Sequence, residues 1–258
     1  MRMVSWNVNG IRACWGNGLE QFLLKEQPDI LTLQEVKSQH DSLPAEIVAP
    51  PGYSTLWHSG GRPGYSGVGA YLRKGTVQPL WILKGMGVPD IDSEGRCLTM
   101  EFETFFLVSA YFPNSGSRGR REPYKKEFCR LMRVFCDNLR ARGKGVLLTG
   151  DYNIAPYDID LFNPQAVSGQ AGTLESEISW MRSMLEEGWI DLVRRDREGE
   201  TGHYSWWSFF DQDRDHNRGW RIDHALASPD LATTMTARLR PDIYGSDHCP
   251  LEVVWKPE

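Results

Sequence analysis

Short apolar runs, separated by clusters of Gly, Pro, Asn and Asp, recur along the whole chain. Runs of roughly four to eight residues that are rich in β-branched and aromatic side chains and bounded by turn residues are typical of strands. We expect strands at Arg2–Asn7, Ile30–Gln34, Gly67–Leu72, Leu98–Phe102, Phe105–Tyr111, Val146–Gly150, Arg221–Ala227 and Leu251–Trp255.

Three segments instead place apolar residues at the spacing of a helix, namely Leu19–Lys25, Pro123–Arg140 and Leu174–Glu187. Thr173 stands where a cap for the third helix is expected, with Glu177 in its first turn. Strands outnumber helices, and both are spread over the chain. We therefore predict an α/β (α+β) fold of two sheets packed face to face with helices outside, in one domain of residues 1–258.

The composition is that of an ordinary globular protein, with 40% hydrophobic and 24% charged residues. The longest apolar stretches, such as Phe105–Phe112, fall far short of the ~20 residues that a membrane span needs. The five cysteines are odd in number and form no Cys-x-x-Cys pair, which favours small buried side chains in a reducing compartment. Because no secretory signal is recognisable either, we expect a cytoplasmic protein that binds no membrane, associated with the nucleoid if the source is prokaryotic.

The net charge of −5 is unusual for a protein that binds nucleic acid. The charge is unevenly distributed, however, because the stretch from Arg118 to Arg133 holds seven basic residues and two acidic ones. Two interpretations of this stretch remain open: a basic face for a phosphate backbone, or the solvated face of a helix.

Polar residues of the kinds that serve as ligands follow several of the predicted strands. They occur in Asn7-Val8-Asn9, Gln34-Glu35, Tyr111 to Asn114, Asp151-Tyr152-Asn153, Ile222-Asp223 and Ser246-Asp247-His248. Because strand ends of packed sheets gather at one rim, these segments can converge on one site although they are far apart in sequence.

The residue types at these ends suit metal-assisted phosphodiester hydrolysis. Carboxylate and amide oxygens are preferred by Mg²⁺ or Mn²⁺, and not by zinc. A histidine beside aspartates suits general acid–base catalysis, and a divalent cation neutralises charge on a phosphoryl oxygen. Taken singly, each acid also has an ordinary interpretation: Asp151 as a turn residue or helix cap, and Asp223 as a surface partner of Arg221.

The sequence resembles the exonuclease III type of apurinic/apyrimidinic endonuclease, within the endonuclease/exonuclease/phosphatase superfamily that includes DNase I. The resemblance spans nearly the whole chain and rests on the residues 5–13, 28–37, 64–69, 111–114, 150–155, 219–223 and 245–250. Two of these stretches, around Tyr65 and at Gly219–Asp223, separate the repair nucleases from lipid and inositol phosphatases. The resemblance implies a four-layered α/β sandwich of two mixed sheets flanked by helices.

The resemblance also implies roles for individual residues. Glu35 is expected to be the main metal ligand, helped by Asn7 and Asp247. His248, oriented by Asp223, is expected to act on the attacking water or the phosphate. Asp151 is expected to position or activate water, or to protonate the leaving 3′ oxygen. The scissile phosphate would be held by Tyr111, Asn114, Asn153 and His248.

The remaining expected contacts involve the DNA around the reacting phosphate. The resemblance implies backbone contacts from Arg12, Lys37 and Tyr65, which would be largely independent of sequence and sensitive to salt. A small apolar pocket for a base-free sugar would be formed by Trp206, Trp220 and Ile222, whereas Trp6, Trp207 and Trp255 are interpreted as core residues.

One loop departs from the family's pattern. The segment 162–170 carries no charge, where relatives commonly have a basic, Asn-rich loop, and Thr173 stands where an aromatic residue is usual. Asn163 and Gln170 remain candidate DNA contacts. The loop after Asn114 contains three arginines instead, so basic charge has shifted from one loop to the other.

We therefore expect a Mg²⁺-dependent phosphodiesterase, with Mn²⁺ as a substitute, that incises double-stranded DNA 5′ to abasic sites and leaves a 3′-hydroxyl. It would act as a monomer and also trim blocked 3′ ends as a 3′-phosphatase, 3′-phosphodiesterase or 3′–5′ exonuclease. The first alternative is a 3′-end-processing enzyme with little activity on abasic sites. The second alternative is a non-catalytic DNA-binding scaffold, which the retained Glu35, Asp151, Asp223 and His248 disfavour.

Overall fold

The computed structural model describes residues 1–76, 78–209 and 213–256, and over these residues two six-stranded sheets pack face to face. The first sheet has the order β13-β14-β1-β2-β4-β3, formed by Met235–Leu239, Leu251–Trp255, Arg2–Asn7, Ile30–Gln34, Val68–Arg73 and Tyr53–His58. The second has the order β5-β6-β7-β8-β12-β9, formed by Trp81–Lys84, Cys97–Glu101, Phe105–Tyr111, Gly145–Asp151, Asp223–Ala227 and Ile190–Asp191. A separate hairpin pairs β10 (Trp206–Trp207) with β11 (Gly219–Trp220).

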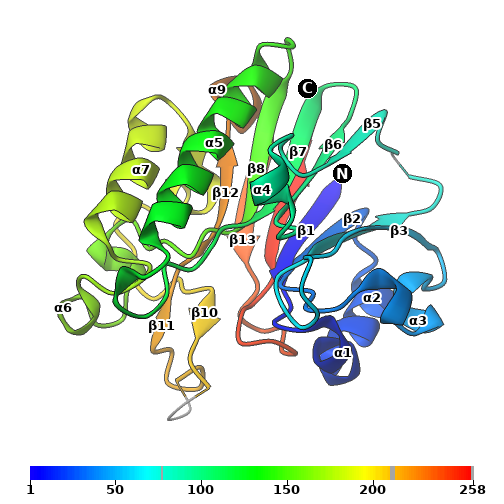
Figure 1. Cartoon of the computed structure of the whole chain (residues 1–258), viewed down its shortest axis with the longest axis horizontal. Helices are drawn as coiled ribbons and strands as arrows, with labels where there is room; N and C mark the ends of the chain where they lie inside the picture. The colour runs from blue at the N-terminus through cyan, green and yellow to red at the C-terminus, as the bar shows by residue number, and fades with distance from the viewer. Residues whose placement is uncertain (77, 210–212, 257–258) are drawn as a thin grey trace.

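Helices cover the outer face of each sheet, so the molecule has four layers (Figure 1). The second sheet is covered by α5 (Glu122–Arg140) and α7 (Glu175–Glu186), whereas α9 (Pro229–Ala232) contacts strands of both sheets. The first is covered by α1 (Ile11–Cys14), α2 (Glu20–Glu26) and α3 (Ala45–Val48). Shorter helical segments lie in the connections, at α4 (Pro89–Asp92), α6 (Pro164–Val167) and α8 (Leu192–Arg195). No helix of the described chain is long and apolar enough to cross a bilayer.

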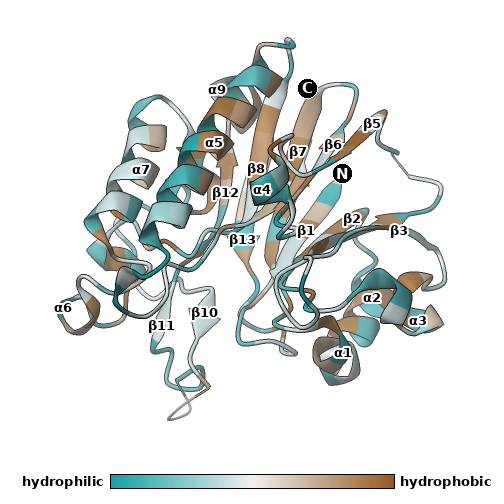
Figure 2. Ribbon diagram, viewed as in Figure 1, coloured by the Kyte–Doolittle hydropathy of each residue, from teal (hydrophilic) through white to brown (hydrophobic). Residues whose placement is uncertain are grey.

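Three apolar clusters lie between the layers and hold them together. The strand β7 illustrates why a strand in such a position has a continuous apolar sequence. In β7, Phe105 and Leu107 face the other sheet, whereas Phe106 and Val108 pack under the outer helices. Successive side chains of a strand point to opposite faces, so a strand covered on both faces must be apolar throughout. Figure 2 shows hydrophobic residues concentrated in the strands and a mixed surface on α5 and α7.

The sequence-based elements are largely confirmed, with identifiable errors. The strands β1, β2, β7 and β14 coincide with their predicted ranges, and α5 begins one residue earlier than predicted. The strand predicted from Arg221 begins at Asp223, and the helix predicted at Leu19 begins with a wider turn at Trp15–Leu19 in which Gly18 has φ 139°.

Thr173 does not cap α7, contrary to the prediction. Leu174 occupies the N-cap position, and the Glu177 carboxylate accepts hydrogen bonds from its backbone N–H at 3.1 Å and from that of Gly172 at 2.7 Å. The Thr173 hydroxyl donates to the carbonyl of Val167 instead. The buried carboxylate of Glu177 therefore accepts hydrogen bonds from backbone N–H groups at the start of α7. Its negative charge is also favourable there because of the helix dipole.

Candidate active site

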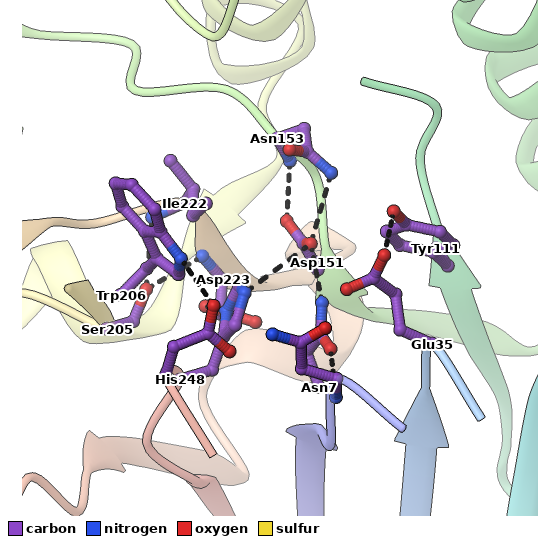
Figure 3. A network of polar contacts seen from close by, with 12 residues as sticks. Asn7, Glu35, Tyr111, Asp151, Asn153, Ser205, Trp206, Ile222, Asp223 and His248 are labelled. Atoms are coloured by element: carbon purple, nitrogen blue, oxygen red, sulfur yellow. Dashed lines mark hydrogen bonds and ion pairs between the residues drawn. The ribbon is translucent and has the colours of Figure 1, made fainter. Parts of the chain in front are cut away.

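The rim of the sandwich where β1, β2, β7 and β8 end is also where the polar segments of the sequence meet (Figure 3). β1 runs parallel to β2, with Asn7 opposite Gln34, and β7 runs parallel to β8, with Tyr111 opposite Asp151. β12 is antiparallel to β8, so its first residue, Asp223, lies opposite Asp151. The topology thus brings residues from both sheets to one edge.

His248 is held in a fixed orientation by an acid behind it. Its Nδ1 lies 2.8 Å from Oδ2 of Asp223, and both side chains are buried. The Ser205 hydroxyl accepts hydrogen bonds from the backbone N–H groups of Ile222 and Asp223, each at 3.0 Å, and so fixes the start of β12. Although burial opposes a charged imidazole, Asp223 raises the pKa of His248 to about 10.

Asp151 is the acid in front of His248. Its Oδ2 lies 4.0 Å from Nε2 of the imidazole and accepts a hydrogen bond from Nδ2 of Asn7 at 2.9 Å. Asn153 donates to it twice, from its backbone N–H at 2.7 Å and from its side chain at 3.1 Å. Burial raises the pKa of Asp151 to about 7 despite the nearby His248, and the charges of Asp223 and Glu35 act in the same direction as burial. Asp151 is thus a carboxyl group suited to exchange a proton near neutral pH.

Glu35 faces Tyr111 across the rim (Figure 3). The Tyr111 hydroxyl donates to Oε1 of Glu35 at 2.5 Å, and the Lys37 ammonium lies 3.6 Å from the same oxygen. Glu35, Lys37, Asn9 and Asn153 all have positive φ, between 43° and 54°. Backbone in this region is uncommon for residues other than Gly, and its concentration at one rim is typical of functional sites.

A cavity of about 510 Å³ opens at this rim. One wall is aromatic, because the rings of Trp206 and Trp220 pack edge to face with centroids 5.8 Å apart beside Ile222. Gly172 lies directly behind the ring of Trp220, where a Cβ would come within 3.0 Å of it. The polar side chains that also line the cavity are Asn9, Glu35, Tyr111, Asn114, Asp151, Asn153, Gln170, Asp247 and His248.

The oxygen donors of this cavity fit a hard divalent cation. Glu35 and Asp247 both line it, and the indole N–H of Trp206 donates to Oδ2 of Asp247 at 3.1 Å. Asn7, predicted as a further ligand, is fully buried and bonded to Asp151, while its Oδ1 accepts from the N–H of Asn9 at 2.9 Å. No group of three His, Cys, Asp or Glu side chains within the described ranges is arranged as a metal site, so a cation here would rely on amide or water oxygens as well.

The candidate DNA contacts lie around this cavity at different distances from it. Gln170 lines the cavity, whereas Asn163 caps α6 by accepting from the N–H of Ala166. Arg12 is exposed, and its guanidinium donates to the carbonyl of Ser42. Lys37 donates to the side chain of Asn9. Tyr65 is half-buried, and its hydroxyl accepts hydrogen bonds from Arg96 and Arg121.

The basic stretch from Arg118 to Arg133 is divided by the fold. Lys125 is buried and donates to the carbonyl of Tyr152 at 2.5 Å, and Arg133 pairs with Glu187. Arg121 and Arg130 also have carboxylate partners. Among the described residues, no ion pair engages the exposed side chains of Arg118, Arg120 and Lys126. Only part of the basic face inferred from the sequence is therefore free for an anionic partner.

Several sequence interpretations of single residues are resolved by burial. All five cysteines are free and buried, as predicted, and burial raises the pKa of the Cys249 thiol to about 12. Trp6 and Trp207 are core residues, and Trp255 packs at the edge of the core between the sheets. Arg221 pairs with Asp160 and Asp191 rather than with Asp223.

Four residues that shape the site were not among those predicted from the sequence. Ser205 fixes the start of β12, Gly172 supports Trp220, and Arg96 with Glu94 packs behind Tyr111. Gly172 follows the segment recognised as unusual, so its position was a usable signal. Ser205 and the Arg96–Glu94 salt bridge could not be recognised from the sequence, because their roles depend on contacts that only the fold creates.

Known proteins resemble this chain in sequence and in fold. The model of the endonuclease/exonuclease/phosphatase family matches residues 4–248. The chain belongs to this family. Enzymes of this family are metal-dependent nucleases, generally with Mg²⁺, and this member is a hydrolytic nuclease.

Individual relatives are similar to this chain over nearly its whole length. It is 36% identical to an exodeoxyribonuclease of Bacillus subtilis, over 98% of this chain and 99% of that protein. It is 39% identical to the DNA repair nuclease APEX1 of Danio rerio, over 97% of this chain and 81% of that protein. A solved structure of the 3′ phosphatase NExo from Neisseria bound to product DNA hairpin superposes with a TM-score of 0.88 and 25% identity, covering 99% of both chains.

Proposed function

We propose that this enzyme is a Mg²⁺-dependent DNA-repair phosphodiesterase that incises double-stranded DNA 5′ to abasic sites and leaves a 3′-hydroxyl. The observation that carries the proposal is the placement of an acid–base pair, Asp151 and His248, beside a cavity with an aromatic wall. The acid–base pair alone would serve any phosphodiester. The aromatic wall supplies the substrate preference.

The substrate phosphate would lie between Asp151 and the opposite side of the rim. The raised pKa of His248 keeps its imidazole charged at neutral pH, so it can stabilise negative charge on the phosphate. Asn153 receives a hydrogen bond from Asn114 at 2.8 Å, which fixes its amide beside Asp151 for phosphate binding. Asp151 would hold the attacking water or deliver a proton to the leaving 3′ oxygen.

The metal would be held by the carboxylates of Glu35 and Asp247, with Asn7 behind them orienting Asp151. When bound, the cation supplies charge neutralisation at a phosphoryl oxygen. The Tyr111 hydroxyl donates to one oxygen of Glu35 and so limits the orientations in which this carboxylate could bind the cation. Mn²⁺ accepts the same oxygen donors and would substitute.

The wall formed by Trp206, Trp220 and Ile222 would receive the base-free deoxyribose. An abasic residue has no base to unstack, so turning it out of the helix costs little. Apolar contact with this wall would favour a sugar that carries no base.

The proposal is tested with a duplex oligonucleotide carrying one abasic analogue, incubated with Mg²⁺ or with EDTA. We expect metal-dependent incision that falls by roughly 10²-fold or more in Asp151→Asn and His248→Ala, because both act on proton transfer or charge. Asp242→Asn, a surface acid paired with Arg240, is the matched control and keeps the wild-type rate. Incision that resists EDTA, or full activity in both site variants, would refute the proposal.

A 3′-end-processing role is the second candidate, favoured by the superposition on the Neisseria 3′ phosphatase. Release of phosphate from a 3′-phosphate duplex is compared with abasic incision under the same conditions. A rate ratio strongly in favour of phosphate release would replace the first candidate by the second. Tight DNA binding without hydrolysis of either substrate would instead indicate a scaffold.

A further inference from the structure

Arg96 is a large charged side chain buried beside Tyr111, and the reaction outlined above does not use it. It is only 1% exposed and precedes β6, opposite Tyr111 at the end of β7. Two hydrogen bonds join these residues, one between their backbones and one from the Arg96 side chain. The Tyr111 N–H donates to the Arg96 carbonyl at 2.8 Å, and Nη1 of Arg96 donates to the Tyr111 carbonyl at 3.1 Å.

The guanidinium also lies on the face of the Tyr111 ring, 4.6 Å from its centroid. A buried cation against an aromatic face is attracted by the ring and restricts where the ring can lie. The opposite end of that ring carries the hydroxyl that donates to Glu35 at 2.5 Å. Arg96 therefore contacts the same ring whose hydroxyl faces the candidate metal ligand.

Arg96 is itself held from the surface side by a small ionic network. Its Nε donates to Glu94 at 2.6 Å and its Nη2 to the Tyr65 hydroxyl at 2.7 Å. Arg121 donates to both oxygens of Glu94, at 2.7 and 3.0 Å, and to the same Tyr65 hydroxyl. Tyr65 is one of the residues from which the family resemblance implies a contact with the DNA backbone.

We propose that Arg96 is a positioning residue, which fixes Tyr111 for the reaction and couples it to the Glu94–Arg121–Tyr65 network at the DNA-binding rim. The inference rests on the proposed function, because it concerns the rate of the same reaction. A lysine cannot replace this arginine, since the three donor directions used here require a planar guanidinium.

A purely structural role for Arg96 predicts a different pattern of effects. Loss of a buried ion pair lowers the free energy of unfolding in any case. A positioning role in addition lowers the rate of the bound complex while leaving DNA affinity nearly unchanged, because misplacement of a reacting group by a small distance costs up to ~10²-fold in rate. It also makes the effect depend on the Tyr111 hydroxyl.

The test is a double-mutant cycle on single-turnover incision of the abasic duplex, with Arg96→Lys, Tyr111→Phe and the double variant. We expect Arg96→Lys to slow incision roughly tenfold or more in the wild-type background. In the Tyr111→Phe background it should have little further effect, because no hydroxyl remains to be positioned. Affinity for the uncleaved duplex is measured in EDTA and should change little in all variants.

Glu94→Gln is the second route to the same answer, because Glu94 is partly exposed and its substitution leaves Arg96 in the fold. It should reproduce a weaker form of the Arg96→Lys effect, again dependent on the Tyr111 hydroxyl. Arg142→Lys is the matched control: its guanidinium lies 4.7 Å from the Phe106 ring and pairs with Glu101, at the opposite end of the same two strands. It should not alter the rate.

Equal rate losses in the two Tyr111 backgrounds, or a loss that appears only as weaker DNA binding, would overturn the inference. Failure of the proposed function has a different signature, namely no abasic incision by the wild-type enzyme. The cycle is then run on release of phosphate from a 3′-phosphate duplex, where the same dependence on Tyr111 is expected.

Discussion

Asn7 at the end of β1 donates its side-chain N–H to Oδ2 of Asp151 at the end of β8, across 2.9 Å and from one sheet to the other. Both residues are buried. The hydrogen bond means that the placement of Asp151 depends on how the two sheets pack, and not only on its own strand. The site is thus assembled by the core between the sheets.

Asn7→Ala should slow abasic incision by roughly 10²-fold while DNA affinity in EDTA stays near that of the wild type, because Asp151 loses its orienting donor. Single-turnover rates and binding by anisotropy separate these two quantities. The matched control is Asn138→Ala, an exposed asparagine on α5. A wild-type rate for Asn7→Ala would show that Asn153 alone is sufficient to orient Asp151.

Trp220→Ala should change substrate preference more than overall activity. The variant loses one side of the aromatic wall, and loss of apolar contact in a pocket is worth ~1–3 kcal/mol of discrimination. The ratio of abasic incision to 3′-phosphate release should therefore fall by about tenfold. Trp81→Ala, at the remote edge strand β5, serves as the control. An unchanged ratio would mean that the wall does not contact the sugar.

Arg118 and Arg120 should contribute to the salt dependence of DNA binding. Each phosphate contact adds ~0.9 to the slope of log affinity against log salt, so the variant with both arginines changed to Ser should lower the slope by up to about 1.8. Arg130→Ser is the control, because that arginine is already paired with Glu127. If both variants keep the wild-type slope, the loop after Asn114 does not reach the backbone.

Asp191→Asn should reduce stability at neutral pH and flatten its acid dependence. Although burial opposes its charge, Arg221 holds the pKa of Asp191 below its usual range. Its contribution is therefore present above the unfolded pKa of ~4 and is lost as the pH falls below that value, because the unfolded chain takes up the proton first.

Breaking this buried pair should lower the free energy of unfolding by ~3–5 kcal/mol at pH 7. Urea unfolding at several pH values between neutral and acid measures both effects. Asp242→Asn, an exposed acid bonded to Arg240, is expected to cost ~1 kcal/mol or less. Equal losses for the two variants would argue against a special contribution of the buried pair.

The sequence was sufficient to predict the central strands and the residues at their ends. β1, β2 and β7 are covered on both faces, so their composition alone marks them. The strands that were missed are mostly edge strands or very short ones: β13 alternates buried and exposed residues over five positions, and β10 and β11 contain two residues each. Such segments are stabilised by their partners rather than by their own composition.

The candidate site was predictable to the extent that each residue type has its own chemistry. His248 and Asp151 could be predicted as reactive groups, because they follow predicted strands together with other ligand-type residues and match the motifs of the family. The hydrogen bond from Asn7 to Asp151, and the contact of Arg96 with Tyr111, join residues 144 and 15 positions apart. Such contacts depend on strand register, which the sequence does not reveal.

Met1 and Trp255 lie beside each other where the neighbouring strands β1 and β14 of the first sheet begin and end. The Met1 nitrogen donates to the carbonyl of Trp255 at 2.8 Å, and Figure 1 places both ends away from the rim where β1 finishes at Asn7. Six residues of strand separate that end of the sheet from the site, or roughly 20 Å. A bead or a fluorescent protein attached next to Met1 or Trp255 would therefore leave the approach of a duplex to the site open.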